Sequence, residues 1–338
     1  MDNDRHLVFG AGLIGGYIAG GLALAGLQCS MVARPSVREA LSKGLILSDY
    51  LGSESSVGAP SFADADENIK YDYLWLTVKC TAIASALEEI AAFVGSDTTI
   101  ICCQNGLGSD QAIRERFTDV RVVQAVFGSN VAQPAPDRLH RSTQGVLVIE
   151  EDGRNDIEAL AEQVNSDLMP TRSSRDFTSE QWAKLQLNLA NAVNALADIP
   201  VKQMLENRHL RRLLAALMRE MLSVTDKKGM SLPRLSPLPP HWLPRLINTP
   251  DWLFLRLGQK MLAVDPTARA SMWWDLKNGK ATEVNYLNAA VVREAATLGL
   301  NAPVNQRVVE LIRKVESGAQ DRNWTPAELA ERLLKDRG

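Results

Sequence analysis

A long run without a charged side chain, from Leu7 to Ala33, constrains the fold of this chain most. The run is long enough to span a bilayer as one helix. Seven glycines lie between residues 10 and 26, however, and their spacing is better explained by a buried strand, a tight turn and a helix. We therefore expect a buried α/β element here and not a membrane span.

The turn inside this run carries a glycine pattern. The segment "VFGAGLIGG" places Gly10, Gly12 and Gly15 in G-x-G-x-x-G spacing, after a β-like run and before a helix-like one. In a dinucleotide-binding fold the first glycine makes the turn, the second lets the backbone approach a pyrophosphate, and the third lets the helix pack on the strand. The free N–H groups of the helix then face the anion. A glycine-rich turn without a ligand is the alternative.

The first half of the chain alternates β-rich runs with helical patterns such as Ala82 to Val94 and Ile157 to Asn165. This order is typical of a parallel sheet with helices on both faces, and several runs are apolar throughout, as doubly covered strands are. The runs are "HLVFGAG", "LQCSMVAR", "YDYLWLTVK", "TTIICCQNG", "VRVVQAVFG", "GVLVIE" and "DLMPTRSS".

The second half of the chain looks all-helical. The apolar residues between Leu210 and Leu222 trace one helix face, and Thr325, Pro326 and Glu328 occupy N-cap, first-turn and capping-box positions. We predict an α/β protein in which residues 1–176 form a Rossmann-type NADP-binding domain and residues 177–338 a helical substrate and catalytic domain.

One stretch of the second half cannot be a continuous helix. Residues 231–252 hold six prolines and two tryptophans. We expect this stretch to wrap over the helical domain or an oligomer partner, with covering the mouth of a site as a further option.

Composition narrows the class of protein. A formal charge of −3 and scattered Lys and Arg argue against nucleic acid as a partner. The four cysteines form no C-x-x-C and the four histidines no H-E-x-x-H, so we expect no metal and a reduced, cytoplasmic protein. The acidic start "MDNDRH" has the wrong sign for a secretory leader.

Three strand ends are candidates for cofactor contacts, because ligands of such sheets lie beyond the carboxyl ends of the strands. Arg34 follows the second strand, where NAD enzymes usually carry an acidic residue, and suits a 2′-phosphate. We predict NADPH as cofactor, with Arg38 as an optional second contact. Lys79 and Asn105 end two further strands, although a lysine or an Asn-Gly turn is also common there without a function.

The segment "KLQLNLANAVNAL", residues 184–196, has two faces. Lys184, Asn188 and Asn191 fall within about 60° of one another on a helix, opposite the apolar positions. A solvated stripe normally carries Glu, Lys, Gln and Arg because these hold helix geometry better than Asn. The amide stripe is either an exposed face that tolerates Asn or the wall of a binding site.

Together these motifs resemble the ketopantoate reductase family. They are the glycine turn, Arg34, the strand ending at Lys79, the Q-N-G-L-G loop at Asn105, W-x-K-L-x-x-N around Lys184, and a late S-x-x-x-D followed by T-E. The resemblance implies NADPH-dependent reduction of a 2-oxo acid to a 2-hydroxy acid, and a helical domain of the 6-phosphogluconate dehydrogenase C-terminal type. It also implies a role in pantothenate and coenzyme A synthesis.

The resemblance assigns roles by position. Lys184 matches the proton donor and Asn188 a substrate ligand. Ser271 matches the residue that holds the substrate carboxylate. Glu283 matches an acid near the reacting carbon, and Asp275 matches an acid beside it. The implied catalytic residues are Lys184 and Glu283. The implied substrate-binding residues are Asn105, Asn188, Asn191, Ser271 and Asp275. The implied cofactor-binding residues are Gly10, Gly12, Leu13, Ile14, Gly15, Arg34, Lys79, Asn105, Ala132 and Glu283.

The chemistry of the lysine helix agrees with these roles. Hydride transfer to a ketone carbon leaves negative charge on its oxygen, so a cation that releases a proton is needed there. Lysine does both when burial lowers its pKa, and neutral asparagines bind oxygens without neutralising it. Thr282 can cap the turn that starts with Glu283, after Asn278 and Gly279 end the helix that carries Ser271 and Asp275.

Some positions depart from the family pattern. The family's second asparagine falls on Ala192 here, with Asn191 and Asn194 on either side as replacements. Three functions therefore stay open: ketopantoate reduction, reduction of another 2-oxo acid or ketone by NADPH, and non-catalytic NADP binding. The partners expected are a small 2-oxo acid, no nucleic acid and no membrane, with a homodimer left open.

Overall fold

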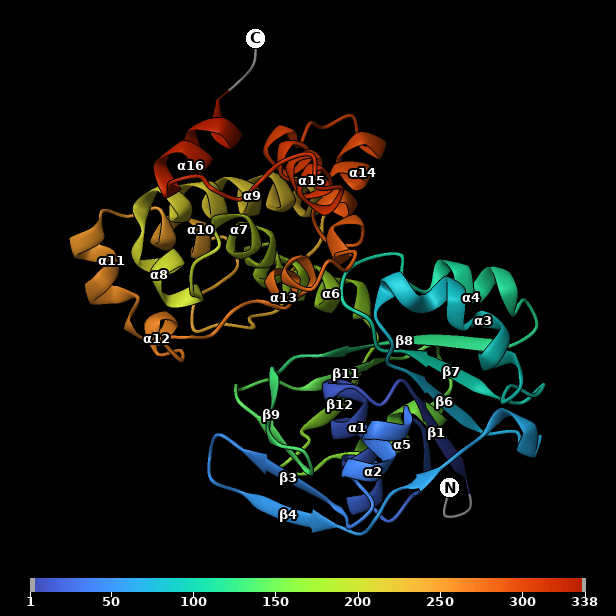
Figure 1. The fold of residues 1–338 in the computed structure, drawn as a ribbon. Coiled ribbons are helices and arrows are strands. Elements are labelled where there is room, and N and C mark those ends of the chain that lie inside the picture. Colours follow the sequence, from blue (N-terminus) through green and yellow to red (C-terminus); the bar gives the residue numbers. More distant parts are fainter. Residues whose placement is uncertain (1–3, 336–338) are drawn as a thin grey trace. The chain divides into compact units, whose positions relative to one another are not determined.

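The computed structural model describes residues 4–335, so the acidic Met1–Asn3 start lies outside the described residues. Contacts divide the chain into two compact units (Figure 1). The first contains Met1–Asn105 and Ser109–Thr178, and the second contains Gly106–Gly108 and Ser179–Gly338. The α/β class with a helical second half is as expected, but the short loop Gly106–Gly108 belongs to the helical unit.

The first unit is built on an eight-stranded sheet. Every strand predicted from the β-rich runs is present, and all neighbouring strands are parallel except β8 and β11, which are antiparallel. Across the sheet the order is β12 (Thr171–Ser174), β11 (Leu147–Glu150), β8 (Arg121–Phe127), β7 (Thr99–Cys102), β6 (Tyr73–Leu76), β1 (Arg5–Phe9), β2 (Gln28–Val32) and β5 (Ser61–Phe62).

Helices cover both faces of this sheet, which explains why β6 and β7 are buried along their whole length. One face packs on α1 (Leu13–Leu24) and α5 (Asn155–Val164), and the other on α3 (Ile83–Ala91) and α4 (Gln111–Arg116) (Figure 1). The short helices of the unit are α2 (Pro35–Ala40), η1 (Ala65–Glu67) and η2 (Cys80–Ala82).

A second sheet in this unit was not predicted from the sequence. Its four strands are, in order, β4 (Glu54–Val57), β3 (Leu45–Asp49), β10 (Arg138–Arg141) and β9 (Val131–Ala135). Leu45, Leu47 and Leu139 point from it into the same core as α1. Helix α1 therefore lies between the two sheets, which fixes the helix that follows the glycine turn.

The second unit is helical apart from the loop Gly106–Gly108. Its helices are α6 (Phe177–Asn188), α7 (Ala190–Ala197), α8 (Val201–Glu206), α9 (Arg208–Lys227), α10 (Leu243–Ile247), α11 (Asp251–Leu257), α12 (Gln259–Leu262), α13 (Ser271–Lys277), η3 (Glu283–Asn285), α14 (Asn288–Thr297), α15 (Pro303–Glu316) and α16 (Pro326–Leu334). The predicted capping box at Thr325 and Glu328 is present at the start of α16.

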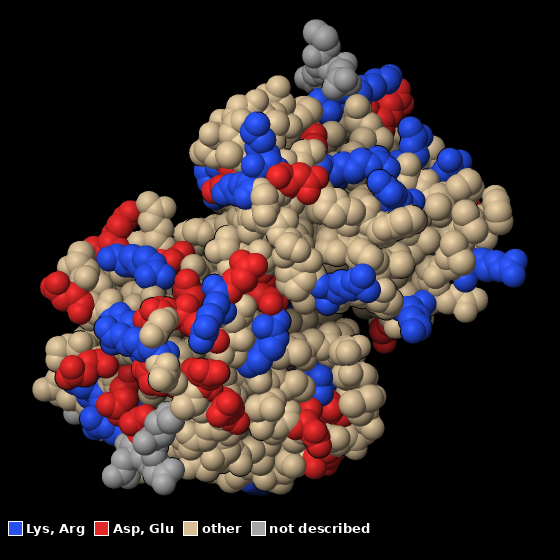
Figure 2. Space-filling model, turned by 180° about the vertical axis from the view of Figure 1, so that it is seen from behind, with Lys and Arg blue, Asp and Glu red and all other residues tan. Residues whose placement is uncertain are grey.

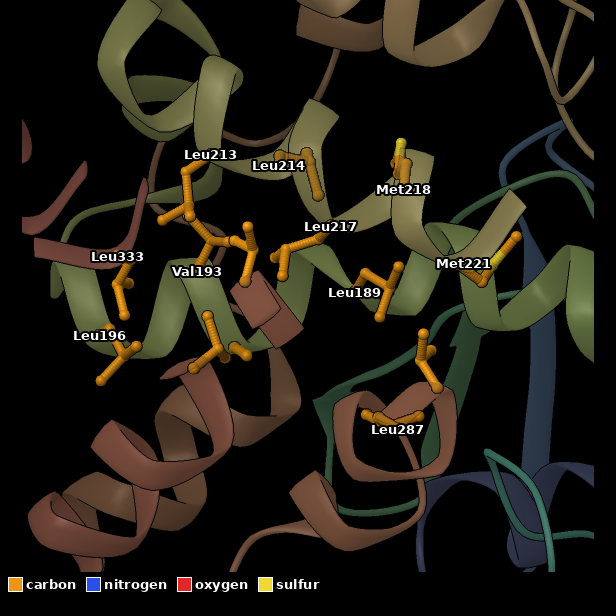
Figure 3. Close-up of a cluster of buried hydrophobic side chains, with 14 of the residues drawn as sticks. Leu189, Val193, Leu196, Leu213, Leu214, Leu217, Met218, Met221, Leu287 and Leu333 are labelled. Carbon is orange, nitrogen blue, oxygen red and sulfur yellow. The ribbon is translucent and has the colours of Figure 1, made fainter. Parts of the chain in front are cut away.

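The core of this unit explains why the lysine helix has two faces. Leu189, Val193 and Leu196 are buried among Leu213 and Leu217 of α9 (Figure 3). Burying a leucine or valine side chain stabilises the fold by about 1.5–3 kcal/mol. Leu185 of α6 belongs to the same core, so the apolar stripe sets the rotation of both α6 and α7 about their axes.

The proline-rich stretch wraps over the helical unit, as expected. The guanidinium of Arg211 on α9 is fully buried beneath it and donates to the carbonyl oxygens of Ile247 and Thr249 and to the Asp251 carboxylate. Gln186 of α6 donates to the carbonyl oxygen of Pro240 at 2.8 Å. Backbone without regular structure is thus fixed by side chains of the helices below it.

Charge on the surface is mixed. On the face shown in Figure 2, Lys and Arg side chains lie among Asp and Glu and among uncharged surface. Within residues 4–335, no helix is both long enough and apolar enough to cross a bilayer, and the apolar run from Leu7 to Ala33 forms β1, α1 and β2 instead.

Candidate functional site

The glycine turn joins β1 to α1 in the way a phosphate-binding turn requires. Gly10 has a φ of +108°, and a Cβ atom there would lie 2.8 Å from the backbone nitrogen of Val78. A Cβ on Gly15 would overlap the carbonyl oxygen of Gly10 and the hydroxyl of Thr77, which themselves share a hydrogen bond of 2.7 Å. The first and third glycines are therefore needed for the turn and for helix packing.

The second glycine leaves space for a ligand. No atom lies within 4 Å of where a Cβ on Gly12 would be, and within residues 4–335 no side chain caps the start of α1. Leu13 and Ile14 form the first turn of this helix, and Leu13 is 42% exposed. Uncapped N–H groups with open space before them suit the pyrophosphate of a dinucleotide.

The two arginines after β2 differ in availability. Arg38 donates to Asp64 at 2.9 Å and to the carbonyl oxygen of Ala63 at 3.1 Å, so its guanidinium holds the chain together. Arg34 is exposed, and its side chain makes no hydrogen bond or ion pair within residues 4–335. Of the two, Arg34 is the one free to bind a phosphate.

Lys79 and Asn105 follow β6 and β7, which are neighbours in the sheet next to β1. Both residues are exposed, and they lie at the same sheet edge as the glycine turn because the three strands are parallel. The buried Gln104 amide donates to the carbonyl oxygens of Leu76 and Val78, which joins the two strand ends. The role of Gln104, which stands directly before Asn105, was not predicted from the sequence.

Ala132 lies on a different element. It is an exposed residue of β9, the edge strand of the small sheet, and β9 packs beside α1. Ala132 therefore lies near α1 and not at the carboxyl edge of the main sheet.

Lys184 lies on α6 and is buried, with 9% of its surface exposed. Burial lowers the pKa of its ammonium from 10.5 to about 8, because a cation loses solvation in the interior. One turn later, the Nδ2 atom of Asn188 is buried with no hydrogen-bond partner in the described part of the chain. A buried amide donor without a partner is uncommon, and a bound water, an ion or a role in the reaction can account for it.

The three asparagines of this stretch have separate roles. Asn194 is fully buried, donates to the carbonyl oxygen of Ile199 at 2.8 Å and accepts from the backbone N–H of Ala270 at 2.9 Å. Both ends of its amide are therefore used by the fold. Asn191 is partly exposed, whereas Ala192 is fully buried in the core. Asn191 is thus the better replacement for the family's second asparagine.

The remaining predicted residues lie on α13 and η3 of the same unit. Ser271 is the exposed first residue of α13, and Asp275 on that helix is 4% exposed. Gly279, with a φ of +61°, follows the end of α13. As predicted, the Thr282 hydroxyl caps η3, whose first residue is the buried Glu283. Glu316 also accepts from the backbone N–H of Thr282 at 2.6 Å and fixes this turn.

A cavity of about 500 Å³ lies elsewhere in the first unit. Arg5, Gln28 and Cys29 at the amino ends of β1 and β2 are among its lining residues. Since the glycine turn follows the carboxyl end of β1, this cavity is not the nucleotide site.

Comparison with known proteins assigns the chain to a family. Residues 6–153 match the family model described as "Ketopantoate reductase PanE/ApbA", and residues 176–316 match "Ketopantoate reductase PanE/ApbA C terminal". The chain belongs to the ketopantoate reductase family. It is accordingly an NAD(P)H-dependent oxidoreductase that acts on a CH–OH group.

Individual ketopantoate reductases align along nearly the whole chain. A 2-dehydropantoate 2-reductase of Archaeoglobus fulgidus is 27% identical over 94% of this chain and 100% of its own. The crystal structure of a PanE/ApbA family ketopantoate reductase from Ralstonia eutropha JMP134 matches with a TM-score of 0.74 at 25% identity. The match covers 94% of this chain and 100% of the other chain.

A protein of different specificity shares the fold. D-mandelate dehydrogenase in a ternary structure with NADH and anilino(oxo)acetate has a TM-score of 0.72 at 17% identity and covers 93% of this chain and 99% of its own. The fold of the ketopantoate reductase family therefore also carries a dehydrogenase for an aromatic 2-hydroxy acid.

Proposed function

We propose that this chain reduces 2-dehydropantoate to pantoate with NADPH. The observation that carries the proposal is the buried Lys184, with its lowered pKa, one helical turn from the buried Nδ2 atom of Asn188, which has no hydrogen-bond partner within residues 4–335. An ammonium with a pKa of about 8 can donate a proton at neutral pH. Bound NADPH supplies the hydride; the roles below belong to the residues of the chain.

The first unit would hold the cofactor. The backbone at Gly10, Gly12 and Gly15, with the first turn at Leu13 and Ile14, would bind the pyrophosphate. Arg34 would bind the 2′-phosphate, which is why we favour NADPH over NADH. The other proposed cofactor contacts are Lys79, Asn105, Ala132 and Glu283.

The second unit would hold the substrate. Lys184 would stabilise the charge that develops on the ketone oxygen and donate a proton to it. Asn188 and Asn191 would bind substrate oxygens, and the exposed hydroxyl of Ser271 would bind the carboxylate. The remaining proposed substrate contacts are Asn105 and Asp275, and Glu283 is proposed to act beside Lys184 in catalysis.

The charges of the two halves fit an acidic substrate. Residues 179–338 contain 23 Lys and Arg against 16 Asp and Glu, a formal charge of +7, whereas residues 1–178 carry −10. A positive unit attracts a carboxylate substrate and raises its encounter rate.

The setting of the reaction is part of the proposal. We place it in pantothenate and coenzyme A synthesis in the cytoplasm. We also propose a homodimer, because Trp252 is 70% exposed and Leu257 58% exposed on the same short helix, and exposed apolar clusters commonly mark association surfaces.

The test is turnover of NADPH with a panel of 2-oxo acids. We expect 2-dehydropantoate to give the highest kcat/KM, and we expect NADH to replace NADPH poorly. Binding of NADPH without turnover of any acid would contradict the proposal and identify a non-catalytic NADP-binding protein.

A second candidate is reduction of a different 2-oxo acid. It is favoured by Ala192, which is fully buried where the family carries its second asparagine, and by Asn194, whose amide is used by the fold. Fewer amides on the substrate side fit a less polar acid. A phenyl-substituted or aliphatic 2-oxo acid with a kcat/KM above that of 2-dehydropantoate would select this candidate.

A further inference from the structure

We propose that Asn194 and Asp198, at the end of α7, are positioning residues that place Ser271 for the substrate carboxylate. The inference rests on the proposed function, because it assigns an indirect role in the same site. Neither residue has a place among the site residues derived above.

The segment that begins α13 is held at three residues on the two sides of Ser271: Arg269, Ala270 and Trp273. The backbone N–H of Ala270 donates to Oδ1 of Asn194 at 2.9 Å. Asp198 Oδ1 accepts from the guanidinium of Arg269 at 3.2 Å and from the indole N–H of Trp273. Ser271 therefore stands between residues whose positions are set by two side chains of α7.

The Asn194 side chain is itself fixed, whereas the Asp198 side chain is partly exposed and is held by the donors of Arg269 and Trp273. Asn194 is fully buried and its Nδ2 donates to the carbonyl oxygen of Ile199, so its amide cannot turn. The backbone at Asp198, which ends α7, has a φ of +52°, and three residues later the N–H of Val201 donates to the carbonyl oxygen of Ala268 at 2.9 Å. A fixed donor or acceptor holds its partner more closely than a mobile one does.

The position of Ser271 relative to Lys184 depends on how the helices that carry them are connected. Helix α6, which carries Lys184 and Asn188, is joined to α7 by the single turn residue Leu189, and α13 packs against α7. Ser271 itself is exposed, and no hydrogen bond of its side chain appears among those of the described residues. The position of Ser271 relative to Lys184 therefore depends on the hydrogen bonds that Asn194 and Asp198 accept from the residues around Ser271. A ligand that is displaced by about 1 Å can lose most of its binding contribution.

The experiment compares Asp198→Ala, Asp198→Asn and Asn194→Ala with wild type in steady-state reduction. We expect Asp198→Ala and Asn194→Ala to raise the KM for the 2-oxo acid about tenfold, while kcat and the KM for NADPH stay within about twofold. Asp198→Asn keeps an acceptor for Trp273 and should recover most of the lost affinity.

Two controls separate placement from general stability. Asn207→Ala removes the N-cap of α9 in the same unit, and should cost about 1 kcal/mol of stability without changing the KM for the acid. Amide exchange at Ala270 gives a readout that needs no turnover, and we expect faster exchange in Asn194→Ala than in wild type.

The outcomes are distinct. An unchanged KM for the acid in both alanine variants, with wild-type turnover present, would overturn the inference and leave the proposed function standing. Unchanged exchange at Ala270 in Asn194→Ala would overturn it as well. Absence of turnover in wild type would count against the proposed function, and faster exchange at Ala270 would then still support the placement of α13.

Discussion

The backbone N–H of Leu107 donates to the carbonyl oxygen of Tyr286 at 2.9 Å. Tyr286 directly follows η3, the turn that starts with Glu283, and Leu107 lies two residues after Asn105. Gly106 makes this contact feasible, because its φ is +88° and a Cβ there would overlap the Tyr286 carbonyl oxygen. The loop after β7 is therefore attached to the turn that carries a proposed catalytic acid.

Gly106→Ala should be far more damaging than Gly108→Ala. Both glycines have a positive φ, but the space around Gly108 is open. Strain alone costs about 1–2 kcal/mol, whereas the added overlap at Gly106 should bring the loss to about 3 kcal/mol or more. Urea unfolding measures both losses, and kcat/KM should fall with Gly106→Ala since Asn105 is displaced. Equal losses for the two variants would contradict the attachment.

Arg34→Ala should weaken NADPH binding about 10–100-fold, because a charge-assisted bond to phosphate contributes about 1.5–3 kcal/mol. Affinity for NADH should change little. Arg38→Ala is the matched control, since its guanidinium is already bound by Asp64 and the carbonyl of Ala63. Binding titrations of each variant with NADPH and NADH measure these changes. An equal loss of affinity for both nucleotides would show that Arg34 does not bind the 2′-phosphate.

Much of the fold and part of the site could be predicted from the sequence. The glycine turn, the strands β1, β6 and β7 and the two faces of the lysine helix have strong local signals, because each combines an apolar period with a turn residue or a cap. The caps at Thr282 and Thr325 were likewise predicted from residue type and spacing.

The rest depends on contacts between distant residues. The strands of the small sheet are short, β9 contains Pro134, and β10 contains two arginines whose ion-pair partners, Glu54 and Asp49, lie far away in the sequence. The three asparagines between residues 188 and 194 look alike in sequence. The hydrogen bonds of Asn194 to Ile199 and from Ala270, which is 76 residues away, show that its amide serves the fold.

Arg211→Met should destabilise the helical unit strongly. The guanidinium is fully buried, binds five oxygen atoms from the backbone and Asp251, and lies over the Phe254 ring. Removing it leaves buried carbonyl groups without donors, which should cost about 3–5 kcal/mol. The exposed neighbour Arg212 is the control, and Arg212→Met should change the free energy of unfolding by less than about 0.5 kcal/mol.

His6 should make stability depend on pH in the acid range. Burial lowers the pKa of this imidazole from 6.5 to about 4, and its Nδ1 accepts from the indole N–H of Trp75. The unfolded chain therefore binds a proton between these pH values that the folded chain does not, so stability falls as pH falls through this window.

Lowering the pH from about 7 to about 5 should remove about 2 kcal/mol through His6. His6→Phe, which keeps a ring beside Tyr73, should reduce this dependence. Urea unfolding of both proteins at the two pH values gives the difference. The same slope in wild type and variant would show that His6 is not the group responsible.

Lys184→Met should produce a protein that is more stable and inactive. The ammonium is buried and its pKa lies at about 8, below the 10.5 of an exposed lysine. Below pH 8 the folded state therefore carries the whole cost of the buried charge, and a methionine of similar length should raise the free energy of unfolding by about 1–3 kcal/mol. NADPH affinity should stay nearly unchanged, because no phosphate contact is removed.

The wild-type rate of reduction should fall as pH rises through about 8, since only the ammonium form of Lys184 can donate the proton. The reverse oxidation needs the neutral amine and should rise through the same window. Lys184→Arg keeps the charge but cannot release a proton, so its residual rate should show no such inflection. Profiles of kcat/KM against pH in both directions test this, and an unchanged inflection in Lys184→Arg would assign the proton to another group.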